Sequence, residues 1–360
     1  MTEKIYSTIT GTGKYIPTQT ISNNNFIDSD FKDTNGSNFE QTNEYIIEKF
    51  EQITTIKERR YVSADLTTSD IAWLAAEDAL KTSNTDREKL DYLIVAHNFG
   101  ELKNGNKEVD ILPSLAARVK KKLGIVNPDT VAYDLPFGCP GWLQAMIQAD
   151  YYIKSGDAQK ILVIGAEILS RVSDPHDRDS MIYADGAGAT ILSACKSQSP
   201  TGILAHKTRS DTLEYSEMLY MGKSYAQTNG TKEGTYLKMN GRKLYQYALK
   251  NVPAAIQSCL HKSGVELSQI KKLLIHQANG KMDDAILKRL FKLEGNQEIP
   301  IDIMPMTIAE LGNSSVATIP TLLDLILKGE LANHQIHKGD KIIFASVGAG
   351  MNINSMIYQA

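Results

Sequence analysis

Three residues of the sequence have types and positions that suit nucleophilic catalysis: Cys139, His276 and Asn313. Cys139 lies between an apolar strand and a predicted helix whose first turn contains Pro140, a favoured early helix residue. We expect the positive helix end and its free N–H groups to stabilise a thiolate and to lower the thiol pKa. Such a cysteine can serve as a nucleophile that carries an acyl group. Its alternative role is that of a small buried apolar residue.

His276 and Asn313 could supply the polar groups that such a reaction needs. His276 ends an apolar strand, at the sheet edge where ligands gather in α/β proteins. A histidine there can accept a proton or donate a hydrogen bond to a carbonyl. Asn313 precedes a helical pattern, and its amide could donate to a developing oxyanion. A structural histidine and a helix N-cap remain the alternative interpretations.

Alternating strands and helices must position these residues. Short apolar runs are predicted to form strands buried on both faces, at 90–97, 161–167, 272–277 and 341–348. Helical periodicity is found over 69–82, 113–123, 141–154, 241–262, 280–293 and 315–328. This alternation predicts an α/β protein built in layers. A surface insertion is expected at 21–50, Asn/Asp-rich at first and then helical.

An internal repeat divides the chain into two similar halves, predicted at 1–198 and 199–360. The matching landmarks are His97 with His276, Cys139 with Asn313, and Gly165 with Ser346. Each pair is separated by about 180 residues, far more than the period of a solenoid repeat. Two halves packed against each other would bring their equivalent strand ends together, and with them Cys139 and His276.

Composition excludes several classes of protein. The chain has 360 residues, 42% of them hydrophobic, and a formal net charge of −3, so no basic field favours nucleic acid. The three cysteines, Cys139, Cys195 and Cys259, lack the spacing of a metal site or a disulfide framework. No signal peptide and no membrane-spanning run is recognisable. We therefore expect a cytoplasmic protein without a metal site.

Several strings of the chain resemble the β-ketoacyl-acyl-carrier-protein synthase III family of thiolase-like condensing enzymes. They are GTGKYIP (11–17), TTIKERRY (54–61), FGCPGW (137–142), LSRVSDPHDRDSMIYADGAGATIL (169–192), HQAN (276–279), LGNSS (311–315) and SVGAG (346–350). The resemblance covers nearly the whole chain. It implies a thiolase-like fold, in which two pseudo-symmetric halves form a five-layered αβαβα core, in agreement with the repeat.

The resemblance also implies an acyltransferase mechanism. Cys139 would take an acyl group from a thioester, with an oxyanion hole formed by its own backbone N–H and that of Ala349. His276 and Asn313 would then bind the carbonyl of malonyl-acyl carrier protein, and the decarboxylated carbanion would attack the acyl-Cys139. No cofactor is implied. The implied partners are acyl carrier protein, an acyl donor on coenzyme A or carrier protein, a malonyl thioester and a second copy of the chain.

Further site residues follow from the same resemblance. The expected substrate contacts are Arg178, Asn279, Trp142 and Phe137. Candidates for carrier-protein docking are Lys281, Lys288 and Arg289, although a solvated helix face would also explain these charges.

One departure from the family pattern favours a second hypothesis. Lys49 and Ile53 stand where the family usually carries the Trp and Arg that clasp the adenine of coenzyme A. Loss of that aromatic surface would weaken nucleotide binding. The chain could therefore be a specialised ketosynthase or acyltransferase of secondary metabolism, for example of the dialkylresorcinol type, that condenses carrier-bound chains. A non-catalytic partner subunit is a third, more remote hypothesis.

Overall fold

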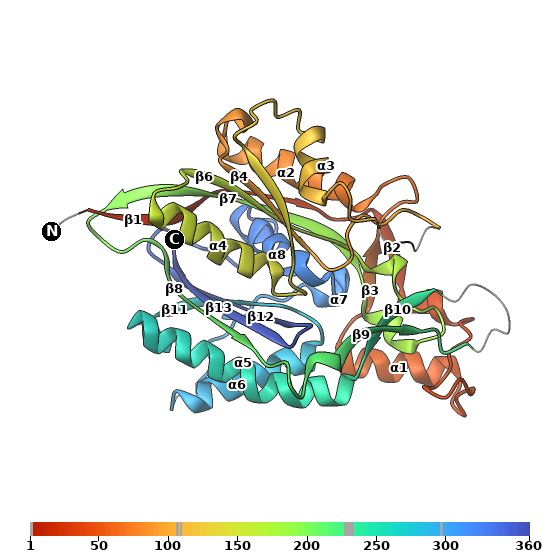
Figure 1. The fold of residues 1–360 in the computed structure, drawn as a ribbon. Helices are drawn as coiled ribbons and strands as arrows, with labels where there is room; N and C mark the ends of the chain where they lie inside the picture. Colours follow the sequence, from red (N-terminus) through yellow and green to blue (C-terminus); the bar gives the residue numbers. More distant parts are fainter. Residues whose placement is uncertain (1–2, 106–107, 109, 227–233, 296–297) are drawn as a thin grey trace.

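Helices and sheets alternate in five layers in the computed structural model (Figure 1). The structure describes residues 3–105, 108, 110–226, 234–295 and 298–360. Within this part of the chain, a five-stranded and a four-stranded sheet enclose a middle layer of helices, and further helices cover the outer face of each sheet. The predicted five-layered αβαβα fold is confirmed.

The first sheet takes its strands from the N-terminal part of the chain. Its order is β1 (Lys4–Tyr15), β7 (Asp185–Ser197), β6 (Lys160–Ile168), β4 (Tyr92–His97) and β5 (Val131–Pro136). β4 pairs in parallel with both β5 and β6, whereas β7 is antiparallel to β1 and β6. Because β4 and β5 run in parallel, His97 and the segment that leads to Cys139 leave the sheet at the same edge.

The second sheet repeats this strand order with one strand fewer. It contains β11 (Ile270–Ile275), β12 (Lys341–Gly348), β13 (Asn352–Gln359) and β8 (Gly202–Ser210). β11 and β12 are parallel, as β4 and β6 are, whereas β13 is antiparallel to both β12 and β8. The segment that would match β5 forms no strand, although the Leu273 N–H donates to the Ile303 carbonyl at 2.8 Å. The two halves therefore share a topology but not every element.

The helices follow the predicted periodicity closely. The outer layers contain α2 (Thr68–Ser83) and α3 (Leu115–Lys122) on one side, α5 (Gly241–Ser263) and α6 (Gly280–Leu293) on the other; the middle layer contains α4 (Gly141–Ser155) and α8 (Thr318–Leu327). The helix predicted at 315–328 begins as the 3-10 turn η7 (Ser315–Ala317), and α8 starts only at Thr318. The delay matters for the site, because Ser315 has a left-handed φ of 53° that an α-helix does not accommodate.

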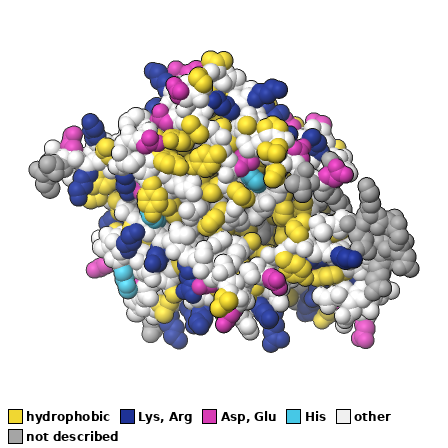
Figure 2. All heavy atoms as spheres, viewed as in Figure 1, with side chains coloured by type: hydrophobic (Ala, Val, Ile, Leu, Met, Phe, Trp, Pro, Cys, Tyr) yellow, Lys and Arg dark blue, Asp and Glu magenta, His cyan; other side chains and the backbone are white. Residues whose placement is uncertain are grey.

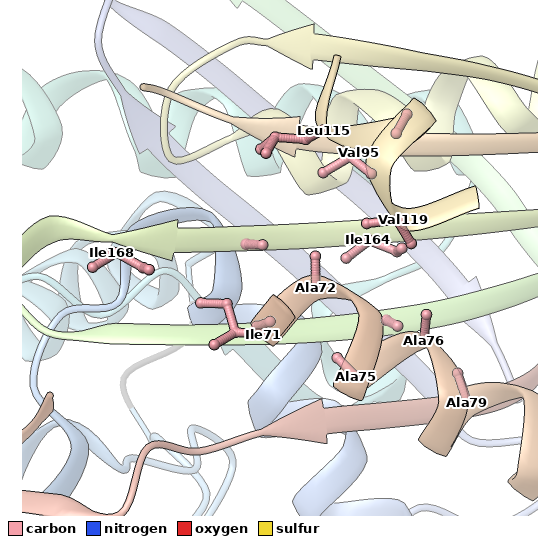
Figure 3. Packing of buried hydrophobic residues seen from close by; sticks show 14 of the residues in the cluster. Ile71, Ala72, Ala75, Ala76, Ala79, Val95, Leu115, Val119, Ile164 and Ile168 are labelled. Carbon is pink, nitrogen blue, oxygen red and sulfur yellow. The ribbon is translucent and has the colours of Figure 1, made fainter. Parts of the chain in front are cut away.

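Close packing of α2 on the first sheet explains the small residues of that region. Ala72, Ala75, Ala76 and Ala79 are fully buried on the face of α2 that meets the sheet (Figure 3). A Cβ atom added at Gly13 of β1 would lie 2.3 Å from both the Ala75 carbonyl oxygen and the Ala79 backbone nitrogen. Only glycine permits this approach.

The predicted insertion contains the helix α1 (Asn43–Thr54). A buried arginine links the start of this insertion to the core. Arg59, on β3 (Glu58–Tyr61), is fully buried and donates to the carbonyl oxygens of Met181 and Ile21. β3 pairs with β2 (Gln19–Ser22), and η1 (Asn23–Phe26) follows. The second half of the insertion is helical as predicted. This helix packs against the rest of the protein and is not a free surface loop.

The remaining elements are short. They are η2 (Arg87–Lys89), η3 (Leu169–Arg171), η4 (Arg178–Ile182), η5 (Ser216–Met218), β9 (Leu219–Lys223), β10 (Thr235–Met239), η6 (Leu267–Gln269) and α7 (Ile308–Leu311). None of the helices in the described ranges is long and apolar enough to cross a membrane.

Candidate active site

A cavity of about 490 Å³ brings together Cys139, His276 and Asn313, which all line its wall. The rest of the wall is mainly apolar and comes from α1, from the β9–β10 pair and from the start of α5. The apolar lining residues on these elements are Tyr45, Ile46, Phe50, Ile53, Leu219, Leu237, Met239, Leu244 and Tyr245. Residues from both halves of the chain thus meet at one apolar site with few polar groups, as expected of a small-molecule pocket.

Cys139 lies in the turn that leads into α4, as the sequence predicts. Cys139 is half-buried and lines the cavity, and the Ser315 hydroxyl lies within hydrogen-bond distance of its sulfur, with Oγ 3.2 Å from Sγ. Burial raises the pKa of the Cys139 thiol to about 11, the charge of Glu167 adds to this rise, and the Ser315 hydroxyl opposes it. The prediction of a lowered thiol pKa is therefore wrong for this resting site. The loss of solvation thus outweighs the hydrogen bonds that would favour the thiolate.

His276 follows β11 and is almost completely buried, with 3% of its surface exposed. Its backbone N–H donates to the Ala345 carbonyl at 2.9 Å, but among the described residues its ring Nδ1 has no hydrogen-bond partner. Burial lowers the pKa of His276 to about 4, against a smaller opposing effect of the Ser315 backbone. The ring is therefore neutral at pH 7, and a neutral imidazole can donate a hydrogen bond to a carbonyl without carrying charge.

Asn313 is held by its backbone and by one side of its amide. Its N–H donates to the Ile182 carbonyl at 3.0 Å, and its own carbonyl accepts from the Ala184 N–H at 2.8 Å. Its Oδ1 accepts from the Ser315 N–H at 2.8 Å. Within the described ranges Nδ2 has no acceptor, so this group is available to a ligand. Asn313 thus combines the predicted turn-capping role with a free amide donor.

The two segments that carry the backbone N–H groups of Cys139 and Ala349 pack against each other. The loop after β12 packs so tightly that a Cβ at Gly348 would lie 2.7 Å from the Cys139 nitrogen, and one at Gly138 would lie 3.1 Å from the Ala349 nitrogen. Neither the Cys139 nor the Ala349 N–H donates to an oxygen of any described residue. This arrangement is what the binding of a developing oxyanion requires.

Of the four predicted substrate contacts, two lie at the cavity and two do not. Arg178 and Asn279 line the cavity. The Arg178 guanidinium lies 4.9 Å from the centre of the Phe39 ring, and Asn279 caps α6 by accepting from the Met282 N–H at 3.1 Å.

Trp142 and Phe137 are not among the residues that line the cavity. Trp142 packs edge-to-face against Phe344, with only 1% of its surface exposed. The cavity offers no support for the predicted substrate contacts of these two residues, because α4 turns the indole into the middle layer. The docking candidates Lys281, Lys288 and Arg289 are exposed on α6.

Three polar residues near Cys139 were not predicted from the sequence: Ser315, Asn98 and Glu167. Ser315 and Asn98 line the cavity, and Glu167 is fully buried near Cys139. One signal could have revealed Glu167, since an acidic residue near the end of a continuous apolar strand must be buried with it. Asn98 directly follows His97, at one landmark of the repeat.

Comparisons with known proteins agree with this geometry. Two family models match the chain: 3-oxoacyl-[acyl-carrier-protein] synthase III at residues 133–212, and the C-terminal part of the same family at residues 260–360. A β-ketoacyl-[acyl-carrier-protein] synthase III of Xanthomonas euvesicatoria is 31% identical over 360 residues, covering 99% of both chains.

Solved structures extend the comparison to the fold. The 3-oxoacyl-[acyl-carrier-protein] synthase III of Aquifex aeolicus superposes with a TM-score of 0.78 and 28% identity, over 98% of this chain and 100% of the other. The priming β-ketosynthase of the R1128 polyketide pathway has the same fold, with a TM-score of 0.79 and 24% identity over 100% and 97% of the two chains.

Proposed function

Because the chain belongs to the 3-oxoacyl-[acyl-carrier-protein] synthase III family of condensing acyltransferases, we propose that Cys139 is its nucleophile and that His276 and Asn313 activate its second substrate. Enzymes of this type use acyl carrier protein and malonyl thioesters as substrates. The observation that carries the proposal is the convergence of these three side chains, from the two halves of the chain, on one cavity.

In the first half-reaction, the Cys139 sulfur attacks the carbonyl carbon of an acyl thioester. The carbonyl oxygen gains negative charge and accepts hydrogen bonds from the N–H groups of Cys139 and Ala349. The tetrahedral intermediate then expels the donor thiolate, which takes up the proton that Cys139 lost. The products are an acyl-Cys139 thioester and the free donor thiol.

In the second half-reaction, the malonyl thioester enters the same cavity. The neutral ring of His276 and the free amide of Asn313 donate to its thioester carbonyl. The C–C bond to the carboxylate breaks, CO2 leaves, and the electron pair remains as an enolate that these two donors stabilise. The enolate carbon attacks acyl-Cys139, the thioester C–S bond breaks, and the β-ketoacyl product leaves with Cys139 regenerated.

Intact-protein mass spectrometry tests this assignment. The full-length chain is incubated with a panel of acyl donors, half on coenzyme A and half on acyl carrier protein. One acyl group per chain is expected on Cys139 and none in Cys139→Ala, with Cys195→Ala as the matched cysteine control. An adduct that persists in Cys139→Ala contradicts the proposed nucleophile.

The partner surfaces are part of the same proposal. Lys281 lies on α6 between two cavity-lining residues, Asn279 and Met282, so it stands near the entrance. We place acyl carrier protein there, with Lys288 and Arg289 completing the basic surface. The negative phosphate of the carrier's prosthetic arm favours such a position.

A homodimer interface would lie at the β5 edge of the first sheet, away from α6. β5 is its edge strand, with β4 on one side only. Apolar side chains gather on the face where α4 lies (Figure 2). Tyr151 of α4 and Val131 of β5 are exposed hydrophobic residues. We propose that two β5 edges lie at this interface, and that 1–198 and 199–360 are the two halves of each subunit.

A carrier-bound acyl donor is favoured by one feature of the cavity mouth. Lys49 and Ile53 line it in place of an aromatic–arginine clamp, and Arg178 is already stacked on Phe39. The second candidate function is therefore a specialised ketosynthase that condenses carrier-bound chains. Competition between acetyl-coenzyme A and acyl-carrier-protein thioesters for Cys139 separates the two. Preferential labelling by the coenzyme A donor removes the second candidate.

A further inference from the structure

We propose that Glu167, Asn98 and Ser315 form a positioning chain that makes the Ser315 hydroxyl a hydrogen-bond donor to the Cys139 sulfur. Glu167 and Asn98 would act through Ser315, and only Ser315 would touch the reacting atom. This inference rests on the proposed role of Cys139 as the nucleophile, and it assigns to three further residues a part in acyl transfer.

The chain begins at a buried carboxyl group. Glu167 of β6 is fully buried, and its Oε2 accepts from the Asn98 backbone N–H at 3.0 Å and also from the Asn98 side-chain amide. Its other oxygen, Oε1, has no partner among the described residues. Because Oε2 already accepts the Asn98 backbone N–H, it acts as an acceptor, and the nitrogen end of the Asn98 amide must face it. Glu167 therefore determines which way Asn98 points.

The orientation of Asn98 determines that of the Ser315 hydroxyl. Nδ2 of Asn98 also donates to Ser315 Oγ at 3.0 Å, and that Oγ lies 3.2 Å from the Cys139 sulfur. Because Asn98 occupies an acceptor site of the hydroxyl, the single hydroxyl proton is left for the sulfur. Asn98 thus donates to both Glu167 and Ser315, and Ser315 in turn donates to Cys139.

Ser315 is also fixed from its backbone side. Its N–H donates to Asn313 Oδ1 at 2.8 Å, and its φ of 53° belongs to the left-handed region. Such a conformation is costly for a residue with a Cβ and persists where the surroundings require it. Held at both ends, the hydroxyl cannot easily rotate away from the sulfur.

A donor in this position has a chemical use. The thiolate is the species that attacks a thioester, and a hydrogen bond to a charged acceptor is stronger than one to a neutral acceptor. The donor therefore favours the attacking form over the resting thiol. The charge of Glu167 acts in the opposite direction on the sulfur, so the contribution of this carboxyl is to orient Asn98.

A purely structural role is the competing explanation. Asn98 and Glu167 belong to the first half and Ser315 to the second, so the same hydrogen bonds also join the two halves. That role predicts a loss of stability on substitution but no change in the reactivity of Cys139 with pH. The two explanations therefore differ in one measurable quantity.

The test measures the rate of Cys139 alkylation by iodoacetamide as a function of pH, in the full-length chain and with the modified peptide identified by mass spectrometry. At pH values below the midpoint, Ser315→Ala is expected to slow alkylation roughly tenfold, which corresponds to an upward shift of the midpoint by about one pH unit, as loss of a hydrogen bond to a charged group implies. Acyl transfer to Cys139 should fall roughly tenfold.

Ser315→Gly is the matched second variant. It also lacks the hydroxyl, but glycine accepts the positive φ without strain, so it should fold at least as well as Ser315→Ala. The same upward shift is expected in both variants. An unchanged midpoint in the well-folded glycine variant overturns the inference.

Asn98→Leu tests the chain one step further away. It removes the amide at similar volume, and its shift should be in the same direction. The double variant with Ser315→Ala should be no worse than the Ser315 variant alone, because both changes break one path. Fully additive shifts overturn the proposed order of the chain.

Failure of this inference can be told from failure of the proposed function. If the unsubstituted protein takes no acyl group on Cys139, the proposed function fails. If it is acylated normally and the Ser315 variants keep its rate and pH profile, only the positioning chain is wrong.

Discussion

The two histidines that stand at matching places in the two halves have opposite surroundings. His97 uses both ring nitrogens: Nε2 lies 3.1 Å from Asp134 Oδ2, and Nδ1 accepts from the Gly100 N–H at 3.0 Å. His276 leaves Nδ1 without a partner among the described residues and lines the cavity. An unsatisfied buried polar group costs stability, so the two histidines differ in how well their rings are satisfied by the protein.

The comparison shows that histidines at equivalent positions of the two halves have different surroundings. Both histidines stand at the end of a parallel strand, β4 or β11. In the first half, Asp134 also accepts from the N–H groups of Leu115 and Ala116, so His97 belongs to a network that holds the start of α3. In the second half, none of the described carboxylates forms an ion pair with His276, in agreement with its proposed role as a donor to substrate.

The largest expected effect is the loss of one reaction step in His276→Ala. Decarboxylation of a malonyl thioester should fall roughly 100- to 1,000-fold, the range for removal of one donor to a developing oxyanion. Acylation of Cys139 should remain close to normal. The two steps are measured separately, by malonyl thioester consumption and by intact mass. Failure to acylate instead would place His276 in the first half-reaction.

The second effect concerns the buried carboxyl group of Glu167, which lies near Cys139. Burial raises the pKa of Glu167 to about 7 from 4.5, with Asn98 and His97 opposing the rise and Asp185 adding to it. A carboxyl with a raised folded-state pKa contributes stability at low pH, and this contribution is lost as the pH rises through 7.

Glu167→Gln removes this titration. Relative to the unsubstituted protein, it should gain roughly 2–3 kcal/mol more stability at pH 8 than at pH 5. Urea unfolding at the two pH values measures the difference, and the titration of Asp185 is common to both proteins. An equal difference at the two pH values would contradict a buried Glu167 that ionises near neutral pH.

The third effect tests the structural member of the histidine pair. His97→Leu leaves the Gly100 N–H and one oxygen of Asp134 without a side-chain partner, so the free energy of unfolding should fall by about 2 kcal/mol. Decarboxylation per folded molecule should be unchanged, in contrast to His276→Ala. A loss of decarboxylation comparable with that of His276→Ala would abolish the distinction between the two histidines.

The smallest effect compares the two basic helices that follow the histidines. Lys281→Glu on α6 should raise the KM for malonyl-acyl carrier protein a few-fold, about 1 kcal/mol or less, as expected of an exposed charge. Lys121→Glu on α3 is the matched control, exposed on the equivalent helix of the other half. Equal effects of the two variants would argue against docking at α6.

Much of the fold could be predicted from local pattern. The apolar runs predicted at 161–167 and 341–348 are β6 and β12 within one or two residues, and α4, α5 and α6 begin at the predicted residues. The prediction failed at 315–328, where a 3-10 turn precedes α8, because the conformation of Ser315 is imposed by its contacts with Asn313 and Asn98. Periodicity reports which face is buried and carries no signal for such contacts.

The site could be predicted only in part. The identities of Cys139, His276 and Asn313 follow from residue type, the repeat and the family resemblance. The thiol pKa was predicted in the wrong direction because the helix end is a local feature, whereas burial and the charge of Glu167 come from assembled layers. Trp142 follows Cys139 closely in sequence, yet α4 directs its side chain into the core.

The sequence by itself determined the order of strands and helices, the duplication and the chemical types at the strand ends, because these follow from local periodicity and composition. Only the tertiary structure decided which groups are satisfied. Ser315 Oγ and Cys139 Sγ are 176 positions apart and meet at 3.2 Å, and Nδ1 of His276 lacks a partner only because of what packs around it. Hydrogen-bond pairing and burial depend on the mutual placement of distant side chains, which no single segment encodes.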